Sequence, residues 1–265
     1  MREVARVLEH AGVPSAEHDA RVLLRYAAER GLPIDDLVAA RSRRVPLQHL
    51  VGTAGFRYLD LQVGPGVFVP RPETELLVDA VLEALPIDGD MAPVVVDLCA
   101  GSGAIGLSVA HEHPRAVVHL VEQSDEAFGW LVRNAECRDR VPSRRVHLHH
   151  GDLADTPASL DGTVDVVVSN PPYLPLDERD LVDPEVRDHD PPDALWAGED
   201  GLAVLQRVVA HSVRLLRAGG RLVVEHSERQ GETVPALFTC AGFVDVSAHA
   251  DLTGRPRFTV GARPC

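Results

Sequence analysis

The sequence predicts an α/β fold in which a small helical domain precedes a doubly wound, mostly parallel sheet. From residue 93 onward, short runs rich in valine and leucine alternate with helical segments, which is typical of βαβ units. A glycine-rich turn follows the first of these runs, where such sheets bind ligands. We divide the chain into a helical domain at 1–50, a linker with a short β-hairpin at 51–75 and a sheet domain at 76–265.

Residues 1–45 are predicted to form short helices. The best defined one covers 16–31, where Ser15 is the expected N-cap and Gly31 the expected C-cap. The next expected elements are a strand at 58–63, a Gly- and Pro-rich loop at 64–75 and a helix at 74–85.

The sheet domain begins with the apolar run PVVVDLCAGSG (93–103), a strand that ends in the glycine turn. Further strands are expected at 116–124, 145–152, 163–170 and 221–227, with helices at 104–113, 125–138, 201–216 and 232–242. Residues 243–252 and 257–263 are expected to form a terminal, hairpin-like pair of strands.

The composition excludes several classes of function. Of the 265 residues, 45% are hydrophobic and 25% charged, as in ordinary globular proteins. The formal net charge of −14 opposes non-specific binding to a phosphate backbone. No apolar run approaches the ~20 residues that span a bilayer, and MREVARVLEHAG (1–12) has charges throughout, unlike a secretory signal. We expect a cytoplasmic protein that binds neither membranes nor nucleic acid.

The cysteines and two residue clusters are interpreted as structural. The chain has four cysteines, Cys99, Cys137, Cys240 and Cys265. They form no C-x-x-C pair, so reduced thiols and no metal site are expected. HLHH (147–150) resembles a metal tract, but strand alternation sends His147 and His149 to one face and His150 to the other. RSRR (41–44) is interpreted as a solvated helix end rather than a basic patch.

The glycine turn is expected to bind a cofactor. Its candidate residues are Asp97, Cys99, Ala100, Gly101, Ser102 and Gly103. Glycines allow the backbone to approach a ligand closely. A dinucleotide site would have G-x-G-x-x-G, whereas this turn has the pattern D-x-x-x-G-x-G and no P-loop lysine. The acidic Asp97 would repel a pyrophosphate but suits a cationic amino acid.

The ends of the next two strands complete the expected cofactor site. The second strand ends in Glu122, whose carboxylate can accept hydrogen bonds from both hydroxyls of a ribose. The third ends at Asp152 and Leu153, where an adenine ring and its amine would lie. An amino acid, a ribose and an adenine together describe S-adenosylmethionine (AdoMet), which we expect as the cofactor. A generic Rossmann nucleotide site is the alternative.

The fourth strand stops abruptly at SNPPY (169–173), because two consecutive prolines cannot continue a strand. The side-chain carbonyl of Asn170 can accept one N–H of a substrate amino group, and the backbone carbonyl of Pro171 can accept the other. Such acceptors beside a flat wall suit a planar –NH2, as in a carboxamide or the exocyclic amine of a base, held with its lone pair toward a methyl carbon. The candidate substrate-binding residues are Asn170, Pro171, Pro172 and Tyr173, with catalytic roles for Asn170, Pro171 and Tyr173.

Several longer stretches carry a family resemblance. They are VFVPRPETELLV (67–78), VVDLCAGSGAIGLSVA (95–110), VSNPPYLP (168–175), HDPPDALWAGEDGL (189–202) and LLRAGGRLVVEHSERQ (215–230). Together they resemble the bacterial release-factor glutamine methyltransferases, the PrmC or HemK family. AGVPSAEHDARVLL (11–24) resembles the N-terminal helical domain of that family.

The resemblance implies a Rossmann-like class I AdoMet-dependent methyltransferase fold with a seven-stranded sheet, in a monomer. It implies methyl transfer to the side-chain amide nitrogen of a protein glutamine, most directly that of the Gly-Gly-Gln motif of peptide-chain release factors, with the helical domain docking the substrate. It also implies that Asn170 contacts the cofactor and that Phe68 and Arg71 lie near cofactor or substrate. A loop-bracing ion pair with Glu73 or Glu75 is a second interpretation of Arg71.

The chain departs from the family pattern at several points. The helical domain is short before VPLQHLVG (45–52), and HSERQ (226–230) replaces a glycine-containing turn. Glu122 stands where Asp is usual, Cys99 replaces a glycine, and Gly55 replaces an acidic residue. These departures are compatible with a paralogue that methylates another protein, such as a ribosomal protein.

Three further classes of function are compatible with an Asn-Pro-Pro-Tyr motif beside an AdoMet site. The first is an N6-adenine-type nucleic-acid methyltransferase, which the acidic balance of the chain disfavours. The second is a methyltransferase for a small-molecule amide or amine. The third is an AdoMet-binding regulator without turnover, which the intact motif at 170–173 disfavours.

Overall fold

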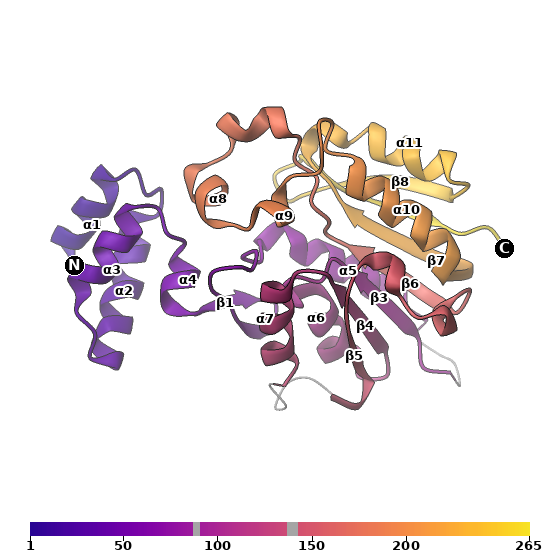
Figure 1. Ribbon diagram of the computed structural model, residues 1–265, viewed down its shortest axis with the longest axis horizontal. Coiled ribbons are helices and arrows are strands. Elements are labelled where there is room, and N and C mark those ends of the chain that lie inside the picture. The colour runs from indigo at the N-terminus through magenta and orange to yellow at the C-terminus, as the bar shows by residue number, and fades with distance from the viewer. Residues whose placement is uncertain (87–90, 137–142) are drawn as a thin grey trace.

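The chain begins with a bundle of short helices, as the sequence predicts. The computed structural model describes residues 1–86, 91–136 and 143–265. The first helices are α1 (Arg2–His10), α2 (Ala16–Arg30), α3 (Ile34–Ser42) and α4 (Leu47–Val51). We call these residues, 1–51, the helical unit; it stands at one end of the molecule (Figure 1). Its own core contains Leu8, Val13, Ala20, Leu23 and Leu47.

The caps of α2 agree in position with the sequence prediction. Gly31 follows the helix in the left-handed conformation, with φ of 64°, which glycine adopts without strain. Ser15 is the N-cap, but its side chain makes no capping bond to the backbone. Instead, its hydroxyl donates to Asp19 Oδ1 at 2.8 Å. The residue types at positions 15 and 31 therefore predicted the ends of the helix correctly. They did not predict that the Ser15 hydroxyl would bond to the Asp19 side chain instead of to the backbone.

The linker forms the expected hairpin, with β1 (Thr53–Phe56) antiparallel to β2 (Leu59–Gln62). Its inward side chains, Phe56, Leu59 and Leu61, pack into the core of the sheet domain. The chain then passes through a loop and a 3₁₀ turn (Pro72–Thr74) into helix α5 (Glu75–Ala84). The hairpin therefore belongs to the sheet domain by packing.

A seven-stranded sheet forms the centre of the molecule. Its strands are β3 (Val94–Leu98), β4 (Val117–Glu122), β5 (Val146–His150), β6 (Val164–Ser169), β7 (Leu216–Glu225), β8 (Val244–Ala250) and β9 (Pro256–Ala262). Their order is β5-β4-β3-β6-β7-β9-β8, parallel except for β9, which is antiparallel to both of its neighbours. The strand order reverses at β3, and ligands bind at such a switch point, beyond the carboxyl ends of the strands.

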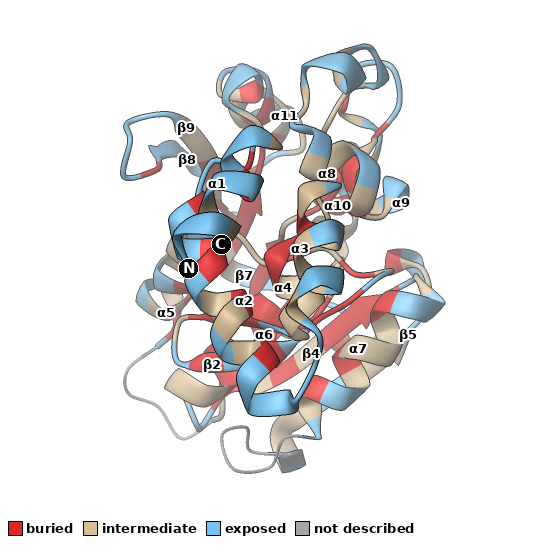
Figure 2. Cartoon of the chain, turned by 90° about the vertical axis from the view of Figure 1, so that its left-hand side faces the viewer, coloured by how far each residue is buried: buried red, intermediate tan, exposed pale blue. Residues whose placement is uncertain are grey.

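Helices cover both faces of the sheet, so the fold is doubly wound. The remaining longer helices are α6 (Ala104–Glu112), α7 (Asp125–Ala135), α10 (Ala203–Leu215) and α11 (Thr233–Cys240). Alternate residues of β3 serve opposite faces: Val95 packs in the core with α5, α6 and α7, and Val96 in the core with α10 and α11. The inner strands β3, β4 and β6 are accordingly largely buried between two helical layers (Figure 2), which explains their mainly apolar sequence, whereas the edge strand β8 is mostly exposed.

Two boundaries in the sheet domain differ from the sequence prediction by three residues or more. Strand β7 begins at Leu216, directly after α10, because Leu216 already pairs with Val164 ahead of an irregularity in register. Helix α7 ends at Ala135, and the last expected helical positions, together with Cys137, lie outside the described residues. Between Asp183 and Trp196 two short helices, α8 (Pro184–His189) and α9 (Pro192–Leu195), interrupt the polar connection.

The histidine-rich strand follows the expected alternation. His147 and His149 both stack on His119, with ring centroids 4.7 and 5.2 Å away, whereas His150 stacks on Phe128 of α7. Among the residues that the structure describes, no group of three or more His, Cys, Asp or Glu side chains is arranged to hold a metal ion. Over the same residues, no helix is both long and apolar enough to cross a membrane.

Candidate active site

A cavity of about 410 Å³ lies beyond the carboxyl ends of β3, β4 and β6, a size usual for small-molecule sites. Most of the candidate residues line it: Phe68, Arg71, Cys99, Ala100, Gly101, Ser102, Glu122, Leu153, Asn170, Pro172 and Tyr173. Four candidates are not among its lining residues: Asp97, Gly103, Asp152 and Pro171. Strand ends far apart in the sequence thus converge on one space.

The glycine turn needs left-handed backbone at three positions. Cys99, Gly101 and Gly103 have φ of 64°, 57° and 85°. Cys99 adopts a conformation that favours glycine, so the family departure at this position carries local strain. A Cβ on Gly101 would meet no heavy atom within 4 Å, which leaves the backbone there open to a ligand. Burial, with Glu122 nearby, raises the pKa of the Cys99 thiol to about 12, so this thiol is not a nucleophile at neutral pH.

Gly103→Ala is expected to destabilise the fold by about 2–4 kcal/mol. A Cβ at this position would lie 2.6 Å from Leu131 Cδ1 and 2.8 Å from Leu107 Cδ1, in addition to the strain of its positive φ. Gly101→Ala is the matched control, because it adds only the positive-φ strain. Urea denaturation of both variants checks this expectation, and an equal loss of stability in the two would contradict the packing argument.

Glu122, at the end of β4, braces the turn. Its Oε2 accepts from the Gly101 N–H and its Oε1 from the Ser124 N–H, both at 2.8 Å. Its side chain is buried yet lines the cavity. Each carboxylate oxygen has a further lone pair, so Glu122 can hold the backbone and still accept from the hydroxyls of a ligand.

Asp97, at the carboxyl end of β3, is buried beneath the turn. Its Oδ2 accepts from the Gly106 N–H at 2.9 Å, in the first turn of α6, where a carboxylate is stabilised by the helix dipole. Burial raises the pKa of Asp97 to about 7. The contact explains why an acidic residue precedes the turn. Direct binding of a cofactor by Asp97 stays a prediction.

Asp152 and Leu153 follow β5, but only Leu153 lines the cavity. The side chain of Leu153 is buried and lines the cavity. Asp152 faces away from it: its Oδ1 accepts from the Ala154 N–H at 2.9 Å and from Arg207 at 2.5 Å. The hydrogen bond from Arg207 lowers the pKa of Asp152. Arg207 itself lines the cavity. The charged side chain on this part of the cavity wall is therefore the cation Arg207, whereas the sequence suggested the acid Asp152.

Asn170, directly after β6, belongs to a chain of hydrogen bonds that orients its amide. Its Nδ2 donates to Thr74 Oγ1 at 3.3 Å, and the Thr74 hydroxyl donates to Glu225 Oε2 at 2.7 Å. The hydroxyl of Tyr173 donates to the other oxygen, Glu225 Oε1, at 3.2 Å. Because Thr74 uses its proton on Glu225, it can only accept from Asn170. We call these four residues the Asn170 network; it leaves the Asn170 carbonyl oxygen as an acceptor for a ligand.

Glu225, at the carboxyl end of β7, is the charged member of this network. Burial raises its pKa to about 7. The same burial, with Glu225 next to it, raises the pKa of the Tyr173 phenol. Tyr173 therefore stays protonated at neutral pH and cannot act as a general base. Tyr173 lines the cavity, and its contact with a flat substrate stays a prediction.

Phe68 and Arg71 line the cavity from the loop after the hairpin. The Arg71 guanidinium lies 4.8 Å from the centre of the Phe68 ring. Its Nη2 pairs with Asp190 Oδ2 at 2.5 Å. The second interpretation of Arg71, a partner at Glu73 or Glu75, is wrong, because the ion pair of Arg71 is with Asp190, far along the chain.

Comparisons with known proteins show the family to which the chain belongs. A family model, Methyltransferase small domain, matches residues 57–181. A release factor glutamine methyltransferase of Streptomyces coelicolor is 48% identical over an alignment of 280 positions. The alignment covers 99% of this chain and 98% of that protein. The chain belongs to the release factor glutamine methyltransferase family. Another protein of this description, from Mycolicibacterium smegmatis, is 45% identical over 97% of this chain and 94% of its own length.

Solved structures confirm the class I methyltransferase fold expected for this family. A methyltransferase from Pyrococcus furiosus superimposes with a TM-score of 0.54 at 16% sequence identity. The match covers 78% of this chain and 90% of that one. At this identity the likeness concerns the fold.

Sequence reasoning missed three parts of the site in this member of the release factor glutamine methyltransferase family. They are Thr74, Glu225 and the short helix α9 with the prolines before it, of which residues 191–195 line the cavity. Glu225 carried the same signal as Glu122, an acidic residue at the carboxyl end of a buried strand. Thr74 and residues 191–195 lie within two of the stretches that carry the family resemblance, 67–78 and 189–202, but sequence reasoning assigned them no role, because they reach the site by packing of distant segments.

Proposed function

We propose that this chain transfers a methyl group from AdoMet to the side-chain amide nitrogen of a protein glutamine, the Gly-Gly-Gln glutamine of peptide-chain release factors. The observation that carries the proposal is the Asn170 network, which occupies the amide nitrogen of a residue that lines the cavity and leaves its amide oxygen as a hydrogen-bond acceptor. A glutamine amide offers two N–H donors. The names of the curated relatives support the choice of substrate.

The cavity fits the proposed cofactor. Its wall includes the open backbone at Gly101, the remaining lone pairs of Glu122 and the apolar side chain of Leu153. They suit in turn a methionine part, a ribose and an adenine. AdoMet supplies an activated methyl group on a sulfonium, which is the difficult part of the chemistry.

The residues of the chain contribute positioning and electrostatics. Asn170 Oδ1 accepts one N–H of the glutamine amide and the carbonyl of Pro171 accepts the other, so that the nitrogen lone pair faces the methyl carbon. Tyr173 and Pro172 flank the flat amide. No strong base is required beforehand, because the nitrogen becomes acidic only as its new bond forms. The helical unit, including the proposed domain at 1–50, would dock the protein substrate.

The decisive experiment is methyl transfer from radiolabelled AdoMet to purified release factors, each as wild type and with the Gln of Gly-Gly-Gln changed to Ala. Label on the wild type alone supports the enzyme class, the partner and the target residue. No label on either, with AdoMet binding intact, would reject the release factors as substrates. Ribosomal proteins, nucleic acid and small amides assayed in parallel would then identify the class of substrate.

Glu122→Ala is expected to raise the AdoMet dissociation constant by about tenfold or more, since a hydrogen bond to a charged group contributes roughly 1.5–3 kcal/mol. Glu122→Gln is the matched control. It retains one acceptor oxygen and the shape of the side chain, so a smaller loss is expected. Isothermal titration calorimetry measures both, and an unchanged constant in the alanine variant would remove Glu122 from the cofactor site.

A further inference from the structure

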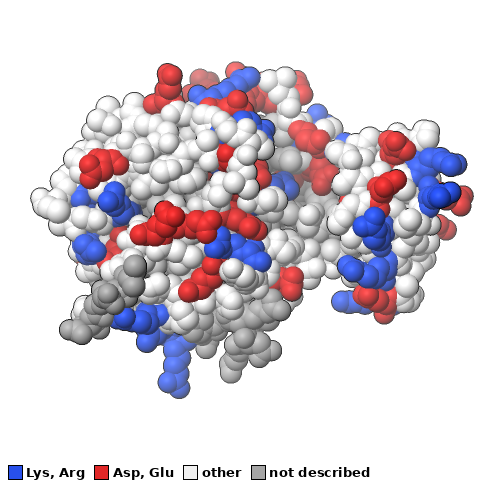
Figure 3. Space-filling model, turned by 180° about the vertical axis from the view of Figure 1, so that it is seen from behind, with Lys and Arg blue, Asp and Glu red and all other residues white. Residues whose placement is uncertain are grey.

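One segment connects the helical unit to the wall of the cavity. We call residues 183–195 the bridging segment; it contains α8, Asp190, Pro191 and α9. Its first part contacts the helical unit, and its last part lines the cavity. Seen from behind, a hollow separates the helical unit from the rest of the molecule (Figure 3). The contacts of the bridging segment span this division.

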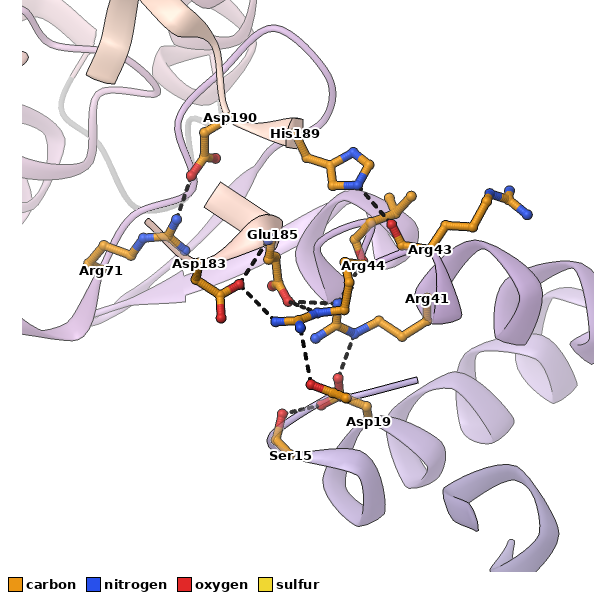
Figure 4. A network of polar contacts seen from close by, with 12 residues as sticks. Ser15, Asp19, Arg41, Arg43, Arg44, Arg71, Asp183, Glu185, His189 and Asp190 are labelled. Atoms are coloured by element: carbon orange, nitrogen blue, oxygen red, sulfur yellow. Dashed lines mark hydrogen bonds and ion pairs between the residues drawn. The ribbon is translucent and has the colours of Figure 1, made fainter. Parts of the chain in front are cut away.

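The main contact is a buried arginine at the end of α3. Arg41 is 3% exposed, so the interpretation of RSRR as a solvated helix end is wrong at this position. Its Nε pairs with Asp19 Oδ2 of α2 at 2.7 Å, and its Nη1 pairs with Glu185 Oε2 of α8, also at 2.7 Å. A buried arginine with fork geometry can hold two carboxylates in fixed places. Arg41 thus ties α8 to the interior of the helical unit (Figure 4).

Two further contacts join the same partners. Arg44 Nη2 pairs with Asp183 Oδ1 at 2.8 Å, and Arg44 Nη1 donates to the Gly12 carbonyl at 3.0 Å. The ring of His189 lies with its Nε2 3.0 Å from the Arg43 carbonyl. Figure 4 shows these side chains converging from α3 and α8. The first half of the bridging segment is therefore held at several points by the helical unit.

The second half of the bridging segment is held against the active site. Asp190 is buried and pairs with Arg71, which lines the cavity beside Phe68. The backbone carbonyl of Leu195 accepts from the N–H of Leu174 at 2.9 Å. Leu174 is the residue that directly follows the Asn-Pro-Pro-Tyr motif. The wall that these residues form stands next to the site proposed for the glutamine.

We propose that Arg41 and Arg44, through Glu185 and Asp183, are positioning residues for methyl transfer: they set the place of the substrate-side wall formed by residues 191–195. The expected effect on kinetics rests on the proposed function, the methylation of a release factor. Docking of a protein substrate on the helical unit would then be transmitted to the glutamine site by direct ion pairs. The bridging segment gives the helical unit a role in the geometry of the active site in addition to binding.

The test is the double variant Asp183→Asn/Glu185→Gln in the full chain. It removes both carboxylate charges that face the helical unit, while Asn still caps α8 and the Asp19–Arg41 pair stays intact. Glu178→Gln is the matched control, since it removes a neighbouring carboxylate whose partner, Arg229, lies outside the helical unit. We expect the double variant to raise KM for the release factor about tenfold, with kcat and the AdoMet dissociation constant within threefold of wild type because the Asn170 network is untouched.

Hydrogen exchange supplies a readout that does not depend on activity. In the double variant the amides of 186–197 are expected to exchange at least about fivefold faster than in wild type, and in Glu178→Gln they are expected to stay unchanged. Unchanged exchange in the double variant would overturn the proposal. Unchanged KM with an active wild type would overturn it too. Faster exchange in a protein that methylates no release factor would uphold the positioning of the wall and reject the proposed substrate.

Discussion

Asn170→Ala is expected to lower kcat by at least about 10²-fold, the usual loss on removal of one preorganised hydrogen-bonding group. The AdoMet dissociation constant should stay within a few-fold of wild type, because Glu122 and the glycine turn are unaffected. Single-turnover methylation measures the first quantity and calorimetry the second. A variant that keeps most of its kcat would disprove the acceptor role of Asn170.

Thr74→Val separates the acceptor itself from its orientation. The substitution keeps the shape of residue 74 and removes the hydroxyl that accepts from Asn170 Nδ2 at 3.3 Å. The amide is then free to rotate, and we expect a loss of kcat of about tenfold, smaller than that of Asn170→Ala. An equal loss in the two variants would mean that Thr74 acts in another way.

Glu225→Gln is expected to lower kcat by about 10²-fold without weakening AdoMet binding. An ionised Glu225 accepts from both Thr74 and Tyr173. A glutamine amide must donate to one of them, so the Thr74 hydroxyl can turn and the Asn170 amide can flip its N–H groups toward the cavity. Methylation kinetics at saturating AdoMet check this. A fully active variant would show that the Asn170 network does not orient the acceptor.

The pH dependence of kcat gives a second test of Glu225, whose pKa is about 7. Protonation of Glu225 adds a donor to a group that must accept twice, so wild-type kcat should rise as pH increases through about 7. Glu225→Gln should flatten this rise. A step that persists in the variant would belong to another group, of which Asp97 and Asp190, with pKa values raised to about 7 and about 6, are candidates.

The contribution of Glu225 to the stability of the fold should decrease with rising pH, whereas kcat should increase. Burial raises the pKa of Glu225 above its value in the unfolded chain, so its contribution to stability is fully present below the ordinary carboxyl pKa and is lost as pH rises through about 7. The Tm of Glu225→Gln relative to wild type should therefore increase between pH 6 and pH 8. A difference in Tm that does not change over this range would argue against a buried ionisable Glu225.

The sequence predicted much of the site because the end of a parallel strand can be recognised from the few residues around it. Glu122, Leu153 and Asn170 each lie at or just after the end of a predicted strand, and the carboxyl ends of parallel strands meet at one edge of the sheet. The same reasoning placed Asp152 at this edge but could not show that its side chain pairs with Arg207. The rule locates a residue on the sheet, while the direction and partner of its side chain depend on neighbours from other elements.

The expectations that are wrong concern charged side chains. Short-range charge patterns assign Arg41 to solvent and Arg71 to a nearby acid. Arg41 pairs with Asp19 and Glu185, and Arg71 pairs with Asp190. The bridging segment brings Glu185 and Asp190 in from far along the chain. Buried arginines require paired charges, but the sequence does not show which acid will be near once the chain has folded.

By itself, the sequence determined the doubly wound α/β class, the glycine turn, the strand-end residues and the family, because each depends on local pattern and motif. Tertiary structure alone decided the position of β9 between β7 and β8, the Thr74–Glu225 bond that orients Asn170, and the ion pairs that hold the bridging segment. The physical reason is range: backbone propensity acts over a few residues, whereas a buried hydrogen bond or ion pair forms between whichever groups packing brings together.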